Sequence, residues 1–154
     1  MSSEEVKILA KEVIEEINKE KKDKRLHNTR LLMKYYNPLK EHLESVSEDI
    51  SKFNFDIDEE EDARTFIGSI ARSKIRTAKM ISYLESAIDI IEKRYKANGE
   101  VEKYQAFVMH YIYENTNEEI QEKFNCGKNT PRRWSNTIID ELSVLLWGVD
   151  ALGI

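Results

Sequence analysis

Six side chains near the end of the chain could hydrogen-bond to nucleic-acid bases or phosphates. Arginine can pair with O6 and N7 of guanine, asparagine with N6 and N7 of adenine, and all six side chains can bind phosphate oxygens. The set is Lys128, Asn129, Thr130, Arg132, Arg133 and Asn136. We therefore asked which element would present these groups on one surface.

A helix beginning at Pro131 would separate the polar side chains from apolar ones. At about 100° per residue, Arg132, Arg133 and Asn136 gather on one side, with Asn129 in register just before the helix. The opposite side carries Pro131, Trp134, Ile138, Glu141, Leu142 and Leu145. Its largely apolar character predicts packing on a preceding helix. The angle favours a core position for Trp134 over an exposed one that stacks on a base.

The residues before this helix have the order expected of a short helix and a tight turn. Thr116 and Glu119 have the spacing of a capping box, which begins a helix. Gly127 suits the positive φ that often ends one. Thr130 is expected to cap the second helix, with Pro131 at its first position. Together these residues predict a helix-turn-helix that binds DNA. The alternative is an antiparallel helix pair whose exposed face happens to be basic.

The charge of this segment differs from that of the whole chain. Residues 121–136 carry Lys123, Lys128, Arg132 and Arg133 against Glu122, a net charge of +3, whereas the 154-residue chain has a net charge of −5. The positive charge is therefore local, as a limited DNA-binding surface requires.

Composition indicates a soluble all-α protein. Hydrophobic residues make up 40% and charged residues 34%, with five Gly and two Pro. No apolar run approaches the roughly 18 residues of a membrane span, and the first residues do not resemble a signal peptide. We expect a cytoplasmic protein without a membrane partner.

Catalytic chemistry finds no support in the sequence. His27, His42 and His110 are isolated, and no glycine-rich phosphate loop is present. Cys126 has no neighbouring Cys or His at metal-ligand spacing and is expected to be a small buried residue at the turn. The sequence therefore predicts no enzyme activity, no cofactor, no metal and no small-molecule substrate.

The region before residue 98 is expected to contain helices joined by an acidic hinge at residues 54–62. One amphipathic helix is expected from Glu4 to about Glu20, and Pro38 should bend or restart the next near Tyr36. The hinge contains the run Asp56 to Asp62, which lacks the spacing of a calcium loop. It is expected to be a solvated hinge; the alternative is that it mimics nucleic acid or contacts a basic partner surface.

A long helix is predicted from about Asp62 to Ala97. Its apolar positions recur at spacings of three and four from Ile67 to Tyr95. Arg72, Arg76 and Lys79 lie away from this seam and are either a solvated face or possible phosphate contacts. These features predict an N-terminal helical hairpin or bundle at residues 1–98 that mediates oligomerisation or partner binding, and a helix-turn-helix domain at residues 99–154.

The last residues are apolar around the whole helix. Val144, Leu145, Leu146 and Trp147 cannot all face one small core. We expect the excess to pack on the long helix, a second subunit or a partner protein.

Two segments resemble the ArpU/RinA-type late-gene transcriptional regulators of phages and prophages of Gram-positive bacteria. The first is Arg25-Leu-His-Asn-Thr-Arg-Leu-Leu-Met-Lys-Tyr-Tyr36, and the second runs from Tyr111 through Arg132-Arg133-Trp134 to Gly148. The C-terminal unit also resembles region four of bacterial sigma factors, which places its second helix in the major groove. Pro131 and Trp134 are departures from that pattern.

The sequence thus predicts a sequence-specific DNA-binding transcriptional regulator, and the resemblance implies an activator of phage or prophage late genes. Double-stranded DNA is the expected partner, together with a second copy of the chain or RNA polymerase. Two other functions fit the same features: a phage small terminase subunit that recognises packaging-site DNA, and a helical adaptor that binds only proteins.

Overall fold

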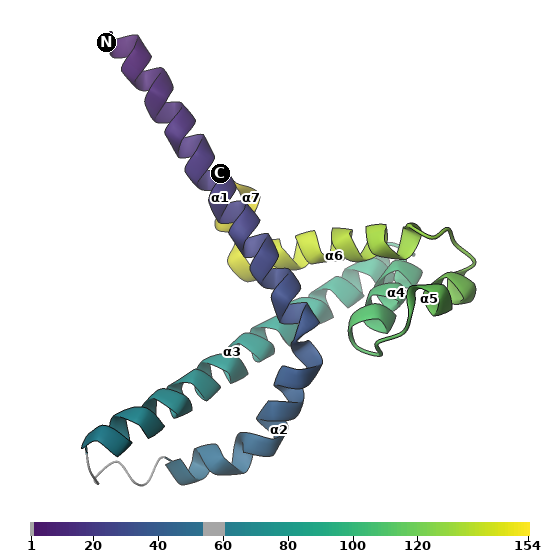
Figure 1. Cartoon of the computed structure of the whole chain (residues 1–154). Helices are drawn as coiled ribbons and strands as arrows, with labels where there is room; N and C mark the ends of the chain where they lie inside the picture. Colours follow the sequence, from purple (N-terminus) through teal and green to yellow (C-terminus); the bar gives the residue numbers. More distant parts are fainter. Residues whose placement is uncertain (1, 54–60) are drawn as a thin grey trace. The chain divides into compact units, whose positions relative to one another are not determined.

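The structure is a computed structural model that describes residues 2–53 and 61–154, with side chains for residues 2–44 and 72–154. The described residues form seven helices and no strand, which confirms the all-α prediction. None of these helices is long and apolar enough to cross a membrane. The helices are α1 (Ser3–Lys34), α2 (Tyr36–Phe53), α3 (Glu61–Ala97), α4 (Val101–Tyr111), α5 (Asn117–Phe124), α6 (Thr130–Trp147) and α7 (Val149–Leu152), labelled in Figure 1.

The chain divides into two compact units. The larger contains residues 1–34 and 87–154, and the smaller contains residues 35–86. The larger unit therefore combines the first helix with the segment that carries the six candidate residues. The functional boundary predicted at residue 98 stays a prediction.

The N-terminal helices meet at Tyr35. α1 runs without interruption to Lys34, so the helix expected to end near Glu20 continues as one helix almost to Tyr36. α2 begins at Tyr36, as the position of Pro38 predicted. Pro38 is tolerated because it lies in the first turn of α2, where backbone N–H groups have no partner within the helix.

In the smaller unit, one polar cluster connects α2 to α3. The Lys40 ammonium donates to the Tyr36 hydroxyl, 3.3 Å away, and the hydroxyl donates to Glu85 Oε1 at 3.3 Å. The same ammonium lies 3.4 Å from Glu85. Burial is the main cause that raises the pKa of Tyr36, so the hydroxyl keeps its proton and remains a donor. The acidic hinge lies outside the described residues, apart from its last two positions, which begin α3.

The predicted seam of α3 is buried over the second half of the helix. Ile81, Leu84, Ile88, Ile91 and Tyr95 are buried, whereas Ile75 is partly exposed. The seam positions 67, 70 and 71 lie outside the residues with described side chains. α3 ends at Ala97, where Gly99 takes a positive φ of 71° and the Glu100 N–H donates to the Tyr95 carbonyl. This agrees with the end predicted at Asn98-Gly99.

The core of the larger unit forms around α6. Its first half packs against α4 and α5, and its second half packs against α1 and α7 (Figure 1). Phe107 of α4, Ile120 of α5, and Ile138, Ile139 and Leu142 of α6 are each at most 1% exposed. Because one side of α6 is buried along most of the helix, only the opposite side can contact a ligand.

One of the apolar C-terminal residues, Trp147, packs on α1, a surface that the sequence did not predict. The Trp147 indole N–H donates to the Thr29 hydroxyl at 3.0 Å. The Arg25 guanidinium lies 4.9 Å from the centre of the same ring and 3.7 Å from the Asp150 carboxylate. Arg25 and Thr29 are one helical turn apart, so the same face of α1 supplies both contacts to Trp147.

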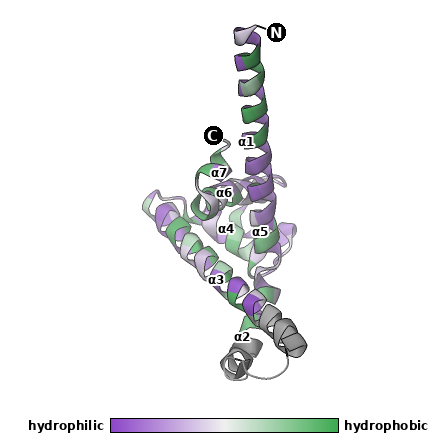
Figure 2. Ribbon diagram, turned by 90° about the vertical axis from the view of Figure 1, so that its left-hand side faces the viewer, coloured by the Kyte–Doolittle hydropathy of each residue, from purple (hydrophilic) through white to green (hydrophobic). Residues whose placement is uncertain are grey.

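The first half of α1 lies outside this core. All residues from 2 to 17 are exposed, although the segment carries several large apolar side chains (Figure 2). Asn18 is the first residue of the helix that is half-buried.

Replacing Trp147 by Phe should lower the free energy of unfolding by about 1 kcal/mol, because the indole hydrogen bond to Thr29 is lost. Chemical denaturation measures the change. In a Thr29→Val background the same substitution should cost less, since the bond is already absent. Equal costs in the two backgrounds would show that this hydrogen bond does not stabilise the fold.

Candidate nucleic-acid interface

The six candidate residues lie at the start of α6 and in the turn before it. Lys128, Asn129, Arg132, Arg133 and Asn136 are exposed, and Thr130 is half-buried. On the other side of the helix, Pro131, Ser135 and Ile138 are buried. The structure therefore brings the arginines and Asn136 to one exposed surface, here called the α6 surface, together with Lys128 and Asn129.

This basic surface ends after about two turns. Asp140 is exposed four residues after Asn136 and one turn further along the same side of the helix. Its carboxylate would repel phosphate. Only the N-terminal part of α6 is thus suited to an anion, and the positive end of the helix dipole lies there as well.

The start of α6 differs by one residue from the prediction. Thr130 is the first helical residue, and Asn129 occupies the N-cap with no capping hydrogen bond from its side chain. Thr130 was expected to be the cap. Instead, its N–H donates to the Gly127 carbonyl at 3.1 Å, so the turn itself begins the helix. The Asn129 amide remains exposed and available to a ligand.

The turn takes its left-handed residue from Asn125 instead of Gly127. Asn125 has φ 48° and ψ 54°, whereas Gly127 does not have a positive φ. The Cys126 N–H then donates to the Gln121 carbonyl at 3.2 Å. Asparagine tolerates this conformation better than most residues other than glycine, so the chain can turn two residues earlier than expected. Cys126 is half-buried, less than was expected.

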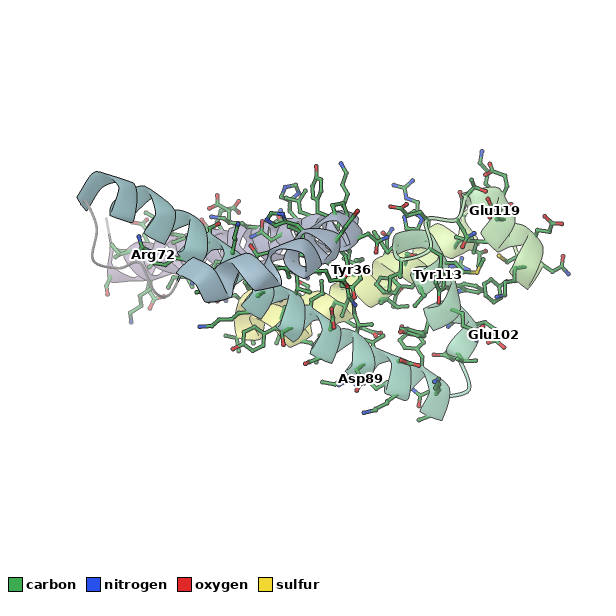
Figure 3. All side chains as sticks on the ribbon, turned by 90° about the horizontal axis from the view of Figure 1, so that it is seen from below. Tyr36, Arg72, Asp89, Glu102, Tyr113 and Glu119 are labelled. Carbon is green, nitrogen blue, oxygen red and sulfur yellow. The ribbon has the colours of Figure 1, made fainter. Side chains whose placement is uncertain are left out.

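The capping box at the start of α5 is confirmed. Thr116 Oγ1 accepts from the Glu119 N–H at 3.2 Å. The Glu119 side chain, labelled in Figure 3, accepts from the Asn115 amide at 2.7 Å and from the Thr116 hydroxyl at 3.2 Å. These hydrogen bonds to the ionised carboxylate, that of Asn115 first, lower the pKa of Glu119.

A further residue, which the sequence did not indicate, fixes the turn. The Asn117 side chain donates to the Lys128 carbonyl at 3.1 Å and so ties the beginning of α5 to the residue that precedes Asn129. The two residues are eleven positions apart, and no spacing rule for helices or turns connects them. The nearest signal was the run of amide and hydroxyl residues at 115–117.

Side chains on the inner side of α6 set its position. Trp134 is half-buried, and its ring meets Phe124 of α5 edge to face at 6.2 Å between centroids. Glu141, the one charged residue expected on this side, accepts a hydrogen bond from the Tyr95 hydroxyl at 3.0 Å. These contacts agree with the core position predicted for Trp134, and they give the inward carboxylate of Glu141 a partner.

Arg72, Arg76 and Lys79 are exposed on α3. They belong to residues 35–86 and so form a surface described separately from the α6 surface. They lie within about 60° of one another around the helix. This arrangement is compatible both with a solvated face and with contacts to phosphate.

The described side chains offer no alternative site with metal chemistry. No group of three His, Cys, Asp or Glu among them could hold a metal ion. Burial lowers the pKa of His110, which favours the neutral ring near pH 7.

Comparisons with known proteins found no relative of this chain. No protein-family model matches it, and neither the curated proteins nor the solved structures contain a significant match. The α6 surface is therefore interpreted from its own residues.

Thr116→Ala should destabilise the larger unit by about 1 kcal/mol, because the first turn of α5 loses its cap. Thermal unfolding monitored by circular dichroism measures the effect.

The ionised carboxylate of Glu119 should stabilise the fold in a pH-dependent way. Because the folded-state pKa of Glu119 is lowered, this contribution to stability is present above the unfolded-state pKa and is lost as the pH falls through the folded-state pKa. Glu119→Gln should therefore destabilise the protein at neutral pH and less in acid. A loss that does not change with pH would contradict this.

Proposed function

We propose that the chain is a sequence-specific, double-stranded-DNA-binding transcriptional regulator in which α5, the turn and α6 act as a helix-turn-helix. The observation that supports this most directly is the division of α6. Arg132, Arg133 and Asn136 are exposed, while the opposite side of the helix is buried. A recognition helix needs this arrangement, because its N-terminal side chains contact base edges in the major groove.

The side chains on this surface suit both kinds of contact that such a protein makes. Arg132 and Arg133 can each bind guanine through two hydrogen bonds, and Asn136 can do the same with adenine. Lys128 and Asn129, in the turn, are placed to bind phosphates beside the helix. Asn117 supports them indirectly by fixing the Lys128 backbone.

Electrostatics limit where DNA can bind. With a net charge of −5, the chain as a whole repels a polyanion, whereas residues 121–136 carry a net charge of +3. DNA is therefore attracted to this segment more than to the acidic remainder. The exposed Asp140 marks the end of the surface along α6.

The resemblance to ArpU/RinA-type regulators suggests that the regulated genes are phage or prophage late genes and that the protein acts as an activator. The two segments that carry this resemblance touch each other in the structure, through Arg25, Thr29 and Trp147. Because the two segments contact each other, a family that keeps one of them would be expected to keep the other. Direct contact with RNA polymerase is part of the same proposal.

One α6 surface offers few contacts, so a single chain should bind DNA weakly. Non-specific protein–DNA complexes have dissociation constants of roughly 10⁻⁴ to 10⁻⁶ M at physiological salt. Two surfaces on adjacent half-sites, or a second protein on the same promoter, would raise the affinity through effective concentration.

Replacing both Arg132 and Arg133 by Ala should abolish specific DNA binding. Both side chains are exposed, so the fold should be retained and the loss should reflect missing base and phosphate contacts. The measurement is fluorescence anisotropy with a duplex selected by the full chain from a random pool. For the unsubstituted protein, log K should fall with log salt concentration, with a slope of about −0.9 per phosphate contacted.

The matched control is Lys93→Ala with Arg94→Ala, which removes two exposed cations from α3. Electrostatic attraction by net charge alone would make both double variants equally weak. The proposal predicts that the control binds nearly as well as the unsubstituted chain. Unchanged affinity in the Arg132 and Arg133 variant would exclude α6 as the recognition helix.

A further inference from the structure

An apolar stripe on the first half of α1 is not covered by the other helices of the larger unit. Val6, Leu9, Val13, Ile14 and Ile17 are 47–57% exposed. A surface helix normally buries such a stripe, because packing supplies most of a helix's stability in proteins. The exposed stripe therefore indicates a partner.

The spacing of the stripe is that of a coiled coil. Val6, Ala10, Val13 and Ile17 follow one another at intervals of four, three and four residues. In heptad notation they occupy positions d, a, d and a, which form the seam between two helices. Val6, Val13 and Ile17 supply the bulky apolar side chains of the seam, and Ala10 allows close approach of the two helices.

The residues beside the seam distinguish between orientations. Position g holds Leu9 and Glu16, and position e holds Lys7, Ile14 and Lys21. In a parallel pair, each g residue faces the e residue five positions later in the other helix. Leu9 would then meet Ile14, and Glu16 would meet Lys21. In an antiparallel pair aligned over the same seam, g faces g and e faces e, so Leu9 would lie against Glu16 and Ile14 against Lys7 of the other chain.

We propose that the first half of α1 pairs with the same segment of a second copy of this chain in a parallel, in-register, two-stranded coiled coil. The evidence is the apolar seam together with its flanks, which in the parallel orientation place Leu9 beside Ile14 and Glu16 beside Lys21 of a second copy. Charge pairs at e and g select partner and orientation in this way. Glu16 and Lys21 have no ion-pair partner within the described residues, so both are free to pair across the interface.

The coiled coil would also bring two α6 surfaces into one assembly. α1 contacts both α6 and α7 within the larger unit, so joining two α1 helices joins two copies of that unit. This pairing does not depend on DNA binding. Experiments without DNA therefore test it separately from the proposed function.

Sedimentation equilibrium of the full chain, without DNA, tests the pairing. The unsubstituted chain should form a dimer whose fraction rises with concentration, and Val13→Glu should weaken it at least tenfold by placing two carboxylates in the seam. Ile8→Glu is the matched control. Ile8 is 57% exposed but lies roughly 160° around the helix from Val6. This control should dimerise like the unsubstituted chain.

A charge exchange tests the orientation. Glu16→Lys alone and Lys21→Glu alone should each weaken the dimer, because each places like charges opposite one another. The two substitutions together should restore it. In addition, Val6→Cys in a Cys126→Ser background should form a symmetric disulfide dimer under mild oxidation. In an antiparallel pair centred on the seam, the two Cys at position 6 would lie at opposite ends.

Several results would overturn the proposal. They are a monomer at every concentration, a ring-sized assembly, equal losses in Val13→Glu and Ile8→Glu, and a double charge variant as weak as the single ones. Circular dichroism of each variant shows whether the rest of the fold is intact. Since residues 2–17 are exposed in the described part of the chain, these substitutions should leave the larger unit folded.

Discussion

The burial of one side of α6 along most of its length is the constraint on which the rest of the structure depends. Ile138, Ile139 and Leu142 have no measurable exposure. They hold the helix between α4 and α5 at one end and α1 and α7 at the other. Because this side is fixed, the rotation of α6 about its axis is fixed too. Arg132, Arg133 and Asn136 are then exposed together, without further contacts to orient them.

The same helix connects the two ends of the chain. Trp147 reaches Thr29 across 118 positions of sequence, and Arg25 covers the indole ring. The larger unit therefore requires residues from both termini. A change in the α1 contact could therefore affect the α6 surface through α6 alone, and two chains joined through α1 would hold their α6 surfaces in one assembly.

Local patterns predicted most of the elements. The all-α class, the restart of the chain near Tyr36, the end of the long helix before Gly99 and the capping box at Thr116 each follow from a few neighbouring residues. The two sides of α6 could also be assigned, because a helix repeats its faces at a fixed angle. The exposure of the candidate residues followed from the same angle.

Local patterns failed where more than one residue could take the same conformation, and where the contacting residues are far apart in the sequence. Gly127 and Asn125 can both turn left-handed, and only the packed structure shows that Asn125 does. The Asn117 bond to Lys128 and the packing of Trp147 on α1 join positions that no local pattern relates. The exposed stripe of α1 was visible as an amphipathic pattern, but its lack of cover could be seen only in the structure.

The most direct test of the central claim is to select duplexes from a random pool with the full chain and to sequence those that are enriched. We expect an enriched motif. If two copies bind together, the motif should contain two half-sites about 10–10.5 base pairs apart, or a multiple of that distance. A pool that stays random after repeated selection would contradict the claim that α6 recognises DNA sequence.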